Sequence, residues 1–130
     1  MLMLMLVLAL TVPLAGGYGR GGDSAESVFA DMTANLREMS EILTSVTDEA
    51  SAKAAVPRIE AVRAKMRDCA RRARAVRRPD AATEKRIDEA MLAVQREVMP
   101  AIADARQRLM AQPPLVAILA PALQGMENDL

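Results

Sequence analysis

Arginine side chains are concentrated in one stretch of this chain, where they are the strongest candidates for binding chemistry. Between residues 50 and 78 there are ten lysines and arginines and two acids, so this stretch has a net charge of +8 and the rest of the neutral chain −8. Guanidinium groups bind phosphate and sulfate through charge and forked hydrogen bonds. We call the candidate residues for an anionic partner the arginine face: Arg63, Arg67, Arg71, Arg72, Arg74, Arg77 and Arg78.

Internal ion pairing is the alternative role for the same arginines. Acids on neighbouring helices would then neutralise them, as is common at protein surfaces, where such pairs are weak. The acids available for this are Asp31, Glu38, Glu41, Asp88, Glu89 and Glu97. Stacking aromatic residues and nucleic-acid-binding motifs are missing, so sequence-specific nucleic acid is not an expected partner.

Enzyme chemistry is not expected from these residue types. Histidine is absent, which removes the commonest acid–base group at neutral pH and the commonest metal ligand. The single cysteine, Cys69, lies on an apolar stripe, which favours a buried packing thiol over an intermolecular disulfide or a reactive group. Asp80, Glu84 and Asp88 share a helix face, but acids in a first helical turn ordinarily complement the helix dipole. We therefore predict no catalytic residue, no cofactor and no metal.

A long helix over residues 48–78 must position the arginines. Its apolar residues recur every three or four positions, as in a heptad stripe: Ile59, Val62, Met66, Cys69, Ala73 and Val76. With Ile59 at position a, the outward positions b and f hold Arg67, Arg71, Arg74 and Arg78. Pro57 removes a backbone donor and its ring opposes a preceding carbonyl, so a kink or a break into two helices is expected there.

Two further amphipathic patterns flank this helix. Ser24 fits the N-cap of a first helix that runs to about Thr47, and residues 80–110 form a third pattern after a reversal at Pro79. Scarce aromatic residues and abundant alanine, methionine, arginine and glutamate are typical of close-packed helices. The predicted fold is all-α: an elongated antiparallel three-helix bundle, coiled-coil-like, with a short C-terminal helix and a preceding signal-like apolar helix.

The C-terminal segment Leu115–Leu123 is mostly apolar and too short to span a membrane. It is expected to cover the core at the end of the bundle where the first two helices meet; the alternative is an exposed segment that docks onto a membrane or a partner. The helical bundle domain is thus predicted over 24–123, after a flexible glycine-rich tether over 18–23 and before a frayed tail over 124–130.

The N-terminal segment predicts export. Residues 1–19 contain no charged side chain and begin with alternating methionine and leucine, which is typical of a signal peptide. Ala15 and Gly17 fit the small residues before a cleavage site, so we expect a signal peptide over 1–17 and a mature chain from Tyr18. No basic residue precedes the apolar run, and its length is close to that of a membrane span, so an uncleaved anchor and a misassigned start stay open.

One segment carries a resemblance to known proteins. The residues from Val46 to Ile59 resemble part of short secreted or lipoprotein-like helical proteins of planctomycete-type bacteria, whose function is uncharacterised. The likeness is clear over 40–78 and weaker to Leu123. Gly17 stands where the lipoprotein pattern has cysteine, so lipid attachment is not implied. The resemblance implies an extracytoplasmic helical protein and supplies no catalytic residue.

These observations predict a non-enzymatic cell-envelope protein, periplasmic or secreted, with an interaction or structural role. Its arginine face would bind an anionic envelope polymer or a membrane surface. The alternative is a periplasmic chaperone-like or adaptor protein that uses the apolar C-terminal segment. Heptad stripes serve packing within one chain and between chains alike, so a homo-oligomer also stays open.

Overall fold

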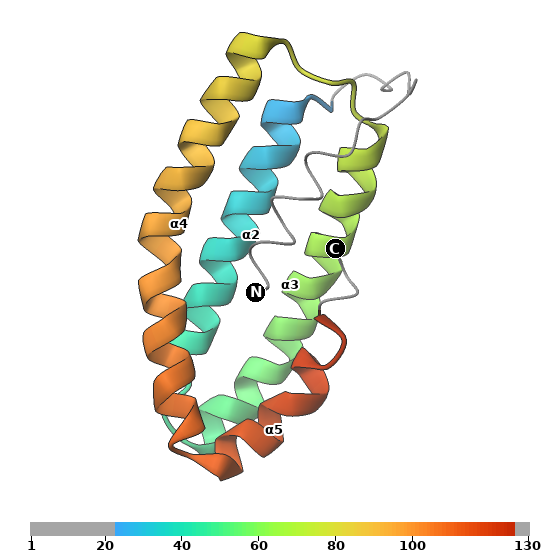
Figure 1. The fold of residues 1–130 in the computed structure, drawn as a ribbon. Helices are drawn as coiled ribbons and strands as arrows, with labels where there is room; N and C mark the ends of the chain where they lie inside the picture. The colour runs from blue at the N-terminus through green and yellow to red at the C-terminus, as the bar shows by residue number, and fades with distance from the viewer. Residues whose placement is uncertain (1–22, 127–130) are drawn as a thin grey trace.

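The computed structural model describes residues 23–126, and within that range it contains helices and no strand (Figure 1). The helices are α2 (Ala25–Ser45), α3 (Glu49–Ala75), α4 (Ala81–Met110) and α5 (Pro113–Leu123). The prediction of an all-α fold is therefore confirmed. The predicted signal peptide over 1–17, the tether up to residue 22 and the last residues of the tail, 127–130, lie outside the described residues.

The three long helices run side by side along the long axis of the molecule, and consecutive helices point in opposite directions (Figure 1). Helix α2 packs against both α3 and α4. Helix α5 lies at the end where α2 and α3 are joined, as predicted, and packs mainly against α3 with a smaller contact to α4 (Figure 1). None of the described helices is long and apolar enough to cross a lipid bilayer.

A polar side chain begins each long helix. Ser24 and Asp48 each form a reciprocal capping box with the serine three residues further on, and Asp48 Oδ1 accepts a hydrogen bond from Ser51 N at 2.7 Å. Asp80 Oδ1 accepts a hydrogen bond from Thr83 N, also at 2.7 Å. These side chains satisfy backbone donors that the first helical turn leaves unpaired, so α2, α3 and α4 start where the sequence predicted.

The two internal prolines, Pro57 and Pro100, lie within continuous helices. Of the two outcomes predicted at Pro57, the break into separate helices is therefore wrong. Ala52 and Ala55 before the proline and Ile59 after it are all buried in the same core, which holds both parts of α3 in one helix. A kink at Pro57 stays a prediction.

One hydrophobic core joins all four helices. Its largest fully buried side chains come from every segment except α4: Ile42, Val46, Ile59, Val62 and Leu119. Helix α4 contributes its own apolar face, on which Ile102 is half-buried and the following residues are buried: Ile87, Met91, Val94, Val98, Ala105 and Leu109. The stripes that the sequence predicts therefore face inward and meet in a common interior.

The end of the domain differs from the predicted frayed tail. Helix α5 buries one side against the core through Leu115, Leu119 and Ala122. Its predicted role as a cover of the core is therefore confirmed. Gly125 has a positive φ of 76°, a conformation that glycine adopts without steric cost after a helix end. Met126 then packs against the core, so the packed domain extends beyond Leu123.

Truncation of Ile59 tests the shared core. Ile59 is 0% exposed, so we expect Ile59→Ala to lower the free energy of unfolding by about 2–5 kcal/mol through lost burial and a residual cavity. The matched control is Leu92→Ala on α4, where the side chain is 53% exposed and the loss should stay within about 0.5 kcal/mol. Urea unfolding followed by circular dichroism measures both. Equal losses in the two variants would contradict the assignment of Ile59 to the core.

Candidate functional site

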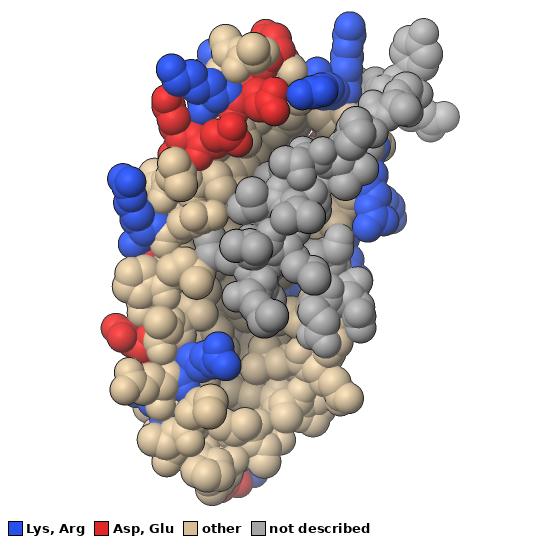
Figure 2. Space-filling model, viewed as in Figure 1, with Lys and Arg blue, Asp and Glu red and all other residues tan. Residues whose placement is uncertain are grey.

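The arginine face occupies the second half of α3 and the loop to α4. Arg63 and Arg72 are half-buried, whereas the other five members are exposed: Arg67, Arg71, Arg74, Arg77 and Arg78. Figure 2 shows lysine and arginine side chains along the right-hand edge, where Figure 1 places this part of α3. The structure thus divides the predicted residues into an inward pair and an outward group.

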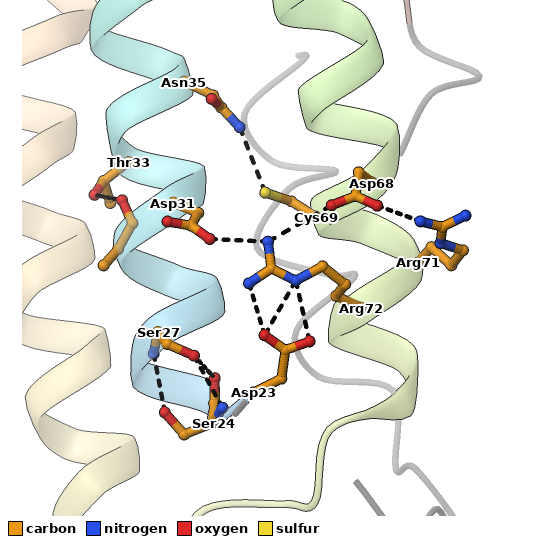
Figure 3. A network of polar contacts seen from close by, with 11 residues as sticks. Asp23, Ser24, Ser27, Asp31, Thr33, Asn35, Asp68, Cys69, Arg71 and Arg72 are labelled. Carbon is orange, nitrogen blue, oxygen red and sulfur yellow. Dashed lines mark hydrogen bonds and ion pairs between the residues drawn. The ribbon is translucent and has the colours of Figure 1, made fainter. Parts of the chain in front are cut away.

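Arg72 links α3 to the start of α2 (Figure 3). Its Nη2 donates to Asp23 Oδ1 at 2.7 Å, and its Nη1 lies 2.8 Å from Asp31 Oδ2. Asp68 on the same helix adds a third carboxylate at 3.6 Å. The hydrogen bonds that Arg72 donates to Asp23, and then to Asp31, raise the pKa of Arg72, and the same bond to Asp23 lowers the pKa of that carboxyl. Arg72 is therefore engaged within the molecule.

Arg63 binds the end of α5. Its Nη1 donates to the carbonyl oxygen of Ala122 at 2.7 Å, and α5 has no basic residue of its own in its last turn. Arg63 therefore supplies the cation that complements the negative end of this helix. Arg108 does the same for α2, donating to the carbonyl oxygens of Val46 and Thr44 at 3.2 and 3.3 Å.

Arg71 and Arg78 keep most of their side-chain surface in solvent. The side chain of Arg71 is 79% exposed and pairs with Asp68, one turn earlier on α3. Arg78 is 71% exposed and lies 3.8 Å from Glu84. Ion pairs this exposed are weak and leave room for an external anion. Because residues three, four and seven apart align on a helix, Arg67, Arg71 and Arg74 share one side of α3 over about 10 Å.

The antiparallel order gathers opposite charges at one end of the molecule. The C-terminus of α3 holds Arg72 and Arg74 in its last turn, while the N-termini of α2 and α4 hold Glu26 and Glu84 in their first turns. The arginines complement the negative C-terminal end of α3, and the glutamates complement the positive N-terminal ends of α2 and α4. Arg86 on α4 also pairs with Glu26 at 2.7 Å, and Figure 2 shows the acids gathered at this end.

Several acids that were alternative partners of the arginine face have other contacts. Asp31 binds Arg72, as internal pairing requires. By contrast, Glu38 binds Lys65 at 2.9 Å, and Glu97 binds Arg37 at 3.0 Å. Internal pairing thus accounts for Arg72, whereas Glu38 and Glu97 are occupied by cations outside the arginine face.

Cys69 is buried, as predicted, and faces α2. Asn35 Nδ2 donates to its Sγ at 3.4 Å (Figure 3). Burial is the main cause that raises the pKa of the Cys69 thiol, so the reactive thiolate form is disfavoured. Among residues 23–126, no group of three or more acidic, cysteine or histidine side chains is arranged to hold a metal ion.

An open groove of about 490 Å³ lies between α2 and α4, and sequence reasoning missed it. Arg37 Nε and Nη2 both donate to Glu97 across the groove, at 3.1 and 3.0 Å, which lowers the pKa of Glu97. Thr44 Oγ1 donates to the carbonyl oxygen of Ser40. Arg37 and Glu97 are therefore paired with each other across the groove, and the Thr44 hydroxyl is paired within α2.

No family model matches this chain, and no curated protein or solved structure is similar enough to count as a match. The resemblance of its Val46–Ile59 segment to exported planctomycete-type proteins therefore stays a prediction. The function has to be argued from the geometry of the arginine face itself.

The Arg72 cluster predicts a pH-dependent loss of stability. In the folded protein the pKa of Asp23 lies below its ordinary value of 3.8. The ionised carboxylate therefore stabilises the fold fully above pH 3.8, and this stabilisation is lost as the pH falls through the lowered pKa of the folded state. We expect Arg72→Gln to lower the urea midpoint at neutral pH, and the difference from wild type to shrink below pH 3.8. Arg77→Gln, an exposed arginine in the loop, is the control that removes the same charge. A pH-independent difference would show that Arg72 acts through packing alone.

Proposed function

We propose that this protein is a non-enzymatic cell-envelope protein, exported to the periplasm or secreted, whose arginine face binds an anionic partner. Its scaffold is an elongated antiparallel three-helix bundle with a short C-terminal helix, and residues 1–17 are a signal-like apolar helix. The single observation that supports binding most directly is the division of the arginines. Arg63 and Arg72 make contacts that serve the fold, while Arg71 and Arg78 extend into solvent.

The outward arginines suit an anionic partner by charge and by geometry. A guanidinium can form two parallel hydrogen bonds to a phosphate or sulfate group, which an ammonium cannot. The residues Arg67, Arg71 and Arg74 lie on one side of α3, so a single partner can contact all three. Since the whole chain is neutral, attraction has to come from this local concentration of charge.

The expected partner is an anionic envelope polymer or a membrane surface, and a homo-oligomer is compatible with either. The chaperone-like or adaptor alternative has less support. It requires large apolar side chains of the C-terminal segment to be available, yet Leu115 and Leu119 are only 4% and 1% exposed. A partner of that kind would have to unfold α5 or use its smaller outward residues.

Retention on a sulfated polyanion matrix across a salt gradient tests this proposal. We expect the full chain to be retained, and Arg71→Gln with Arg74→Gln to lower the salt concentration of elution and reduce the salt slope of binding by about 2, roughly one for each lost contact. The matched control, Arg96→Gln with Arg106→Gln, removes the same charge from exposed positions on α4 and should change little. Elution of the wild-type chain without retention, or equal losses in the two double variants, would refute binding through the arginine face.

A further inference from the structure

Helix α5 exposes an uncharged surface. The sequence has no charged residue from Leu109 to Met126. With one side of α5 committed to the core, the outward side consists of small apolar residues and prolines: Pro113, Pro114, Val116, Ala117, Ala120 and Pro121. Val116 is 40% exposed, and Met110 at the preceding helix end is 67% exposed. We call this outward side, together with Met110, the apolar patch.

The apolar patch adjoins the arginine face on one side of α3. Arg63 lies four residues before Arg67 and eleven before Arg74, spacings that place the three side chains on one side of the helix. Arg63 is also the residue that binds Ala122 at the end of α5, at 2.7 Å. Helix α5 therefore covers this side of α3 up to Arg63, and the outward arginines continue from there. In Figure 2 the surface over α5 is uncharged, and basic side chains follow above it along the same edge.

An anionic bilayer surface is the partner that fits both the arginine face and the apolar patch. Lipid phosphates bind guanidinium groups, and the interface below them accepts exposed apolar side chains. Either contribution alone gives weak, reversible attachment, whereas the two together give stable attachment. Between Arg63 and Arg78 the sole acid is Asp68, which is paired with Arg71 and Arg72. A linear polyanion would engage the arginines and gain nothing from α5.

We infer that the partner of the arginine face is a membrane surface rich in anionic phospholipid, and that the apolar patch of α5 enters the interface of the same membrane. This inference rests on the proposed function and names its partner. The molecule then lies against the bilayer with α3 and α5 facing the lipid and α4 turned to another side.

A single tryptophan reports this orientation, because the natural chain has none. Ala117→Trp places the reporter in the apolar patch, and Leu92→Trp places it at an exposed site on α4 as the matched control. The full chain is mixed with vesicles of phosphatidylcholine alone or with phosphatidylglycerol, each containing brominated lipid. We expect a shift of emission to shorter wavelength and quenching for Ala117→Trp with phosphatidylglycerol, and neither change for Leu92→Trp. The position of the reporter matters because the apolar residues 1–17 could attach the chain to any vesicle.

Adding the arginine variants completes the test. Quenching of Ala117→Trp should be lost with Arg71→Gln and Arg74→Gln and kept with Arg96→Gln and Arg106→Gln. Circular dichroism verifies that each variant folds, and Val116→Trp replaces Ala117→Trp if that variant does not. Equal quenching in phosphatidylcholine alone, or in the Leu92→Trp control, would overturn the inferred orientation. Salt-sensitive retention on the polyanion matrix without quenching would overturn the membrane inference and leave the proposed function standing; loss of both would refute both.

Discussion

Burial of one apolar stripe per helix in a shared core is the constraint on which the rest of the structure depends. Once Ile59, Val62 and Met66 face the interior, the rotation of α3 about its axis is fixed. Positions beside the stripe then lie next to neighbouring helices, and positions opposite it face solvent. Arg63 and Arg72 are of the first kind and contact α5 and α2, whereas Arg71 is of the second. The core therefore decides which arginines contact neighbouring helices and which face solvent.

The same constraint organises the charges at the helix ends. Short antiparallel connections place the C-terminus of α3 beside the N-termini of α2 and α4, where partial charges of opposite sign meet. Helices that lack a basic residue in their last turn receive one from elsewhere. Arg108 reaches the carbonyl of Val46 at the end of α2, and Arg63 reaches that of Ala122 at the end of α5. These contacts form because the packing of the helices brings each arginine within hydrogen-bonding distance of a carbonyl oxygen at a helix end.

Local features of the fold could be predicted from the sequence because they depend on neighbouring residues. The caps at Ser24, Asp48 and Asp80 and the inward stripes follow from spacings of three and four residues. The predicted break at Pro57 was wrong because tertiary packing on both sides of the proline outweighs the local cost of an interior proline, while a kink there stays a prediction. The contact of Arg72 with Asp23 joins residues 49 apart in sequence, so it depends on the relative rotation of two helices, which no local pattern encodes. For the candidate site, heptad position correctly separated the exposed helix residues Arg67, Arg71 and Arg74 from the stripe. It did not apply to Arg78, which lies in the loop after α3, and it could not identify the partners of Arg63 and Arg72.

Fold stability accounts for Arg72 more fully than for the exposed Arg71. Arg72 is held by two carboxylates of another segment, and its side chain is only 25% exposed, the arrangement expected of a structural ion pair. Arg71 contacts an acid of its own helix at 79% exposure, where an ion pair adds little. The dipole of α3 adds a favourable interaction for Arg72 and Arg74 in its last turn, whereas like charges three and four residues apart on one helix repel one another. A row of outward arginines is thus unfavourable for an isolated helix, and an anionic surface that neutralises the row together, beside an apolar patch on the same side, removes that repulsion.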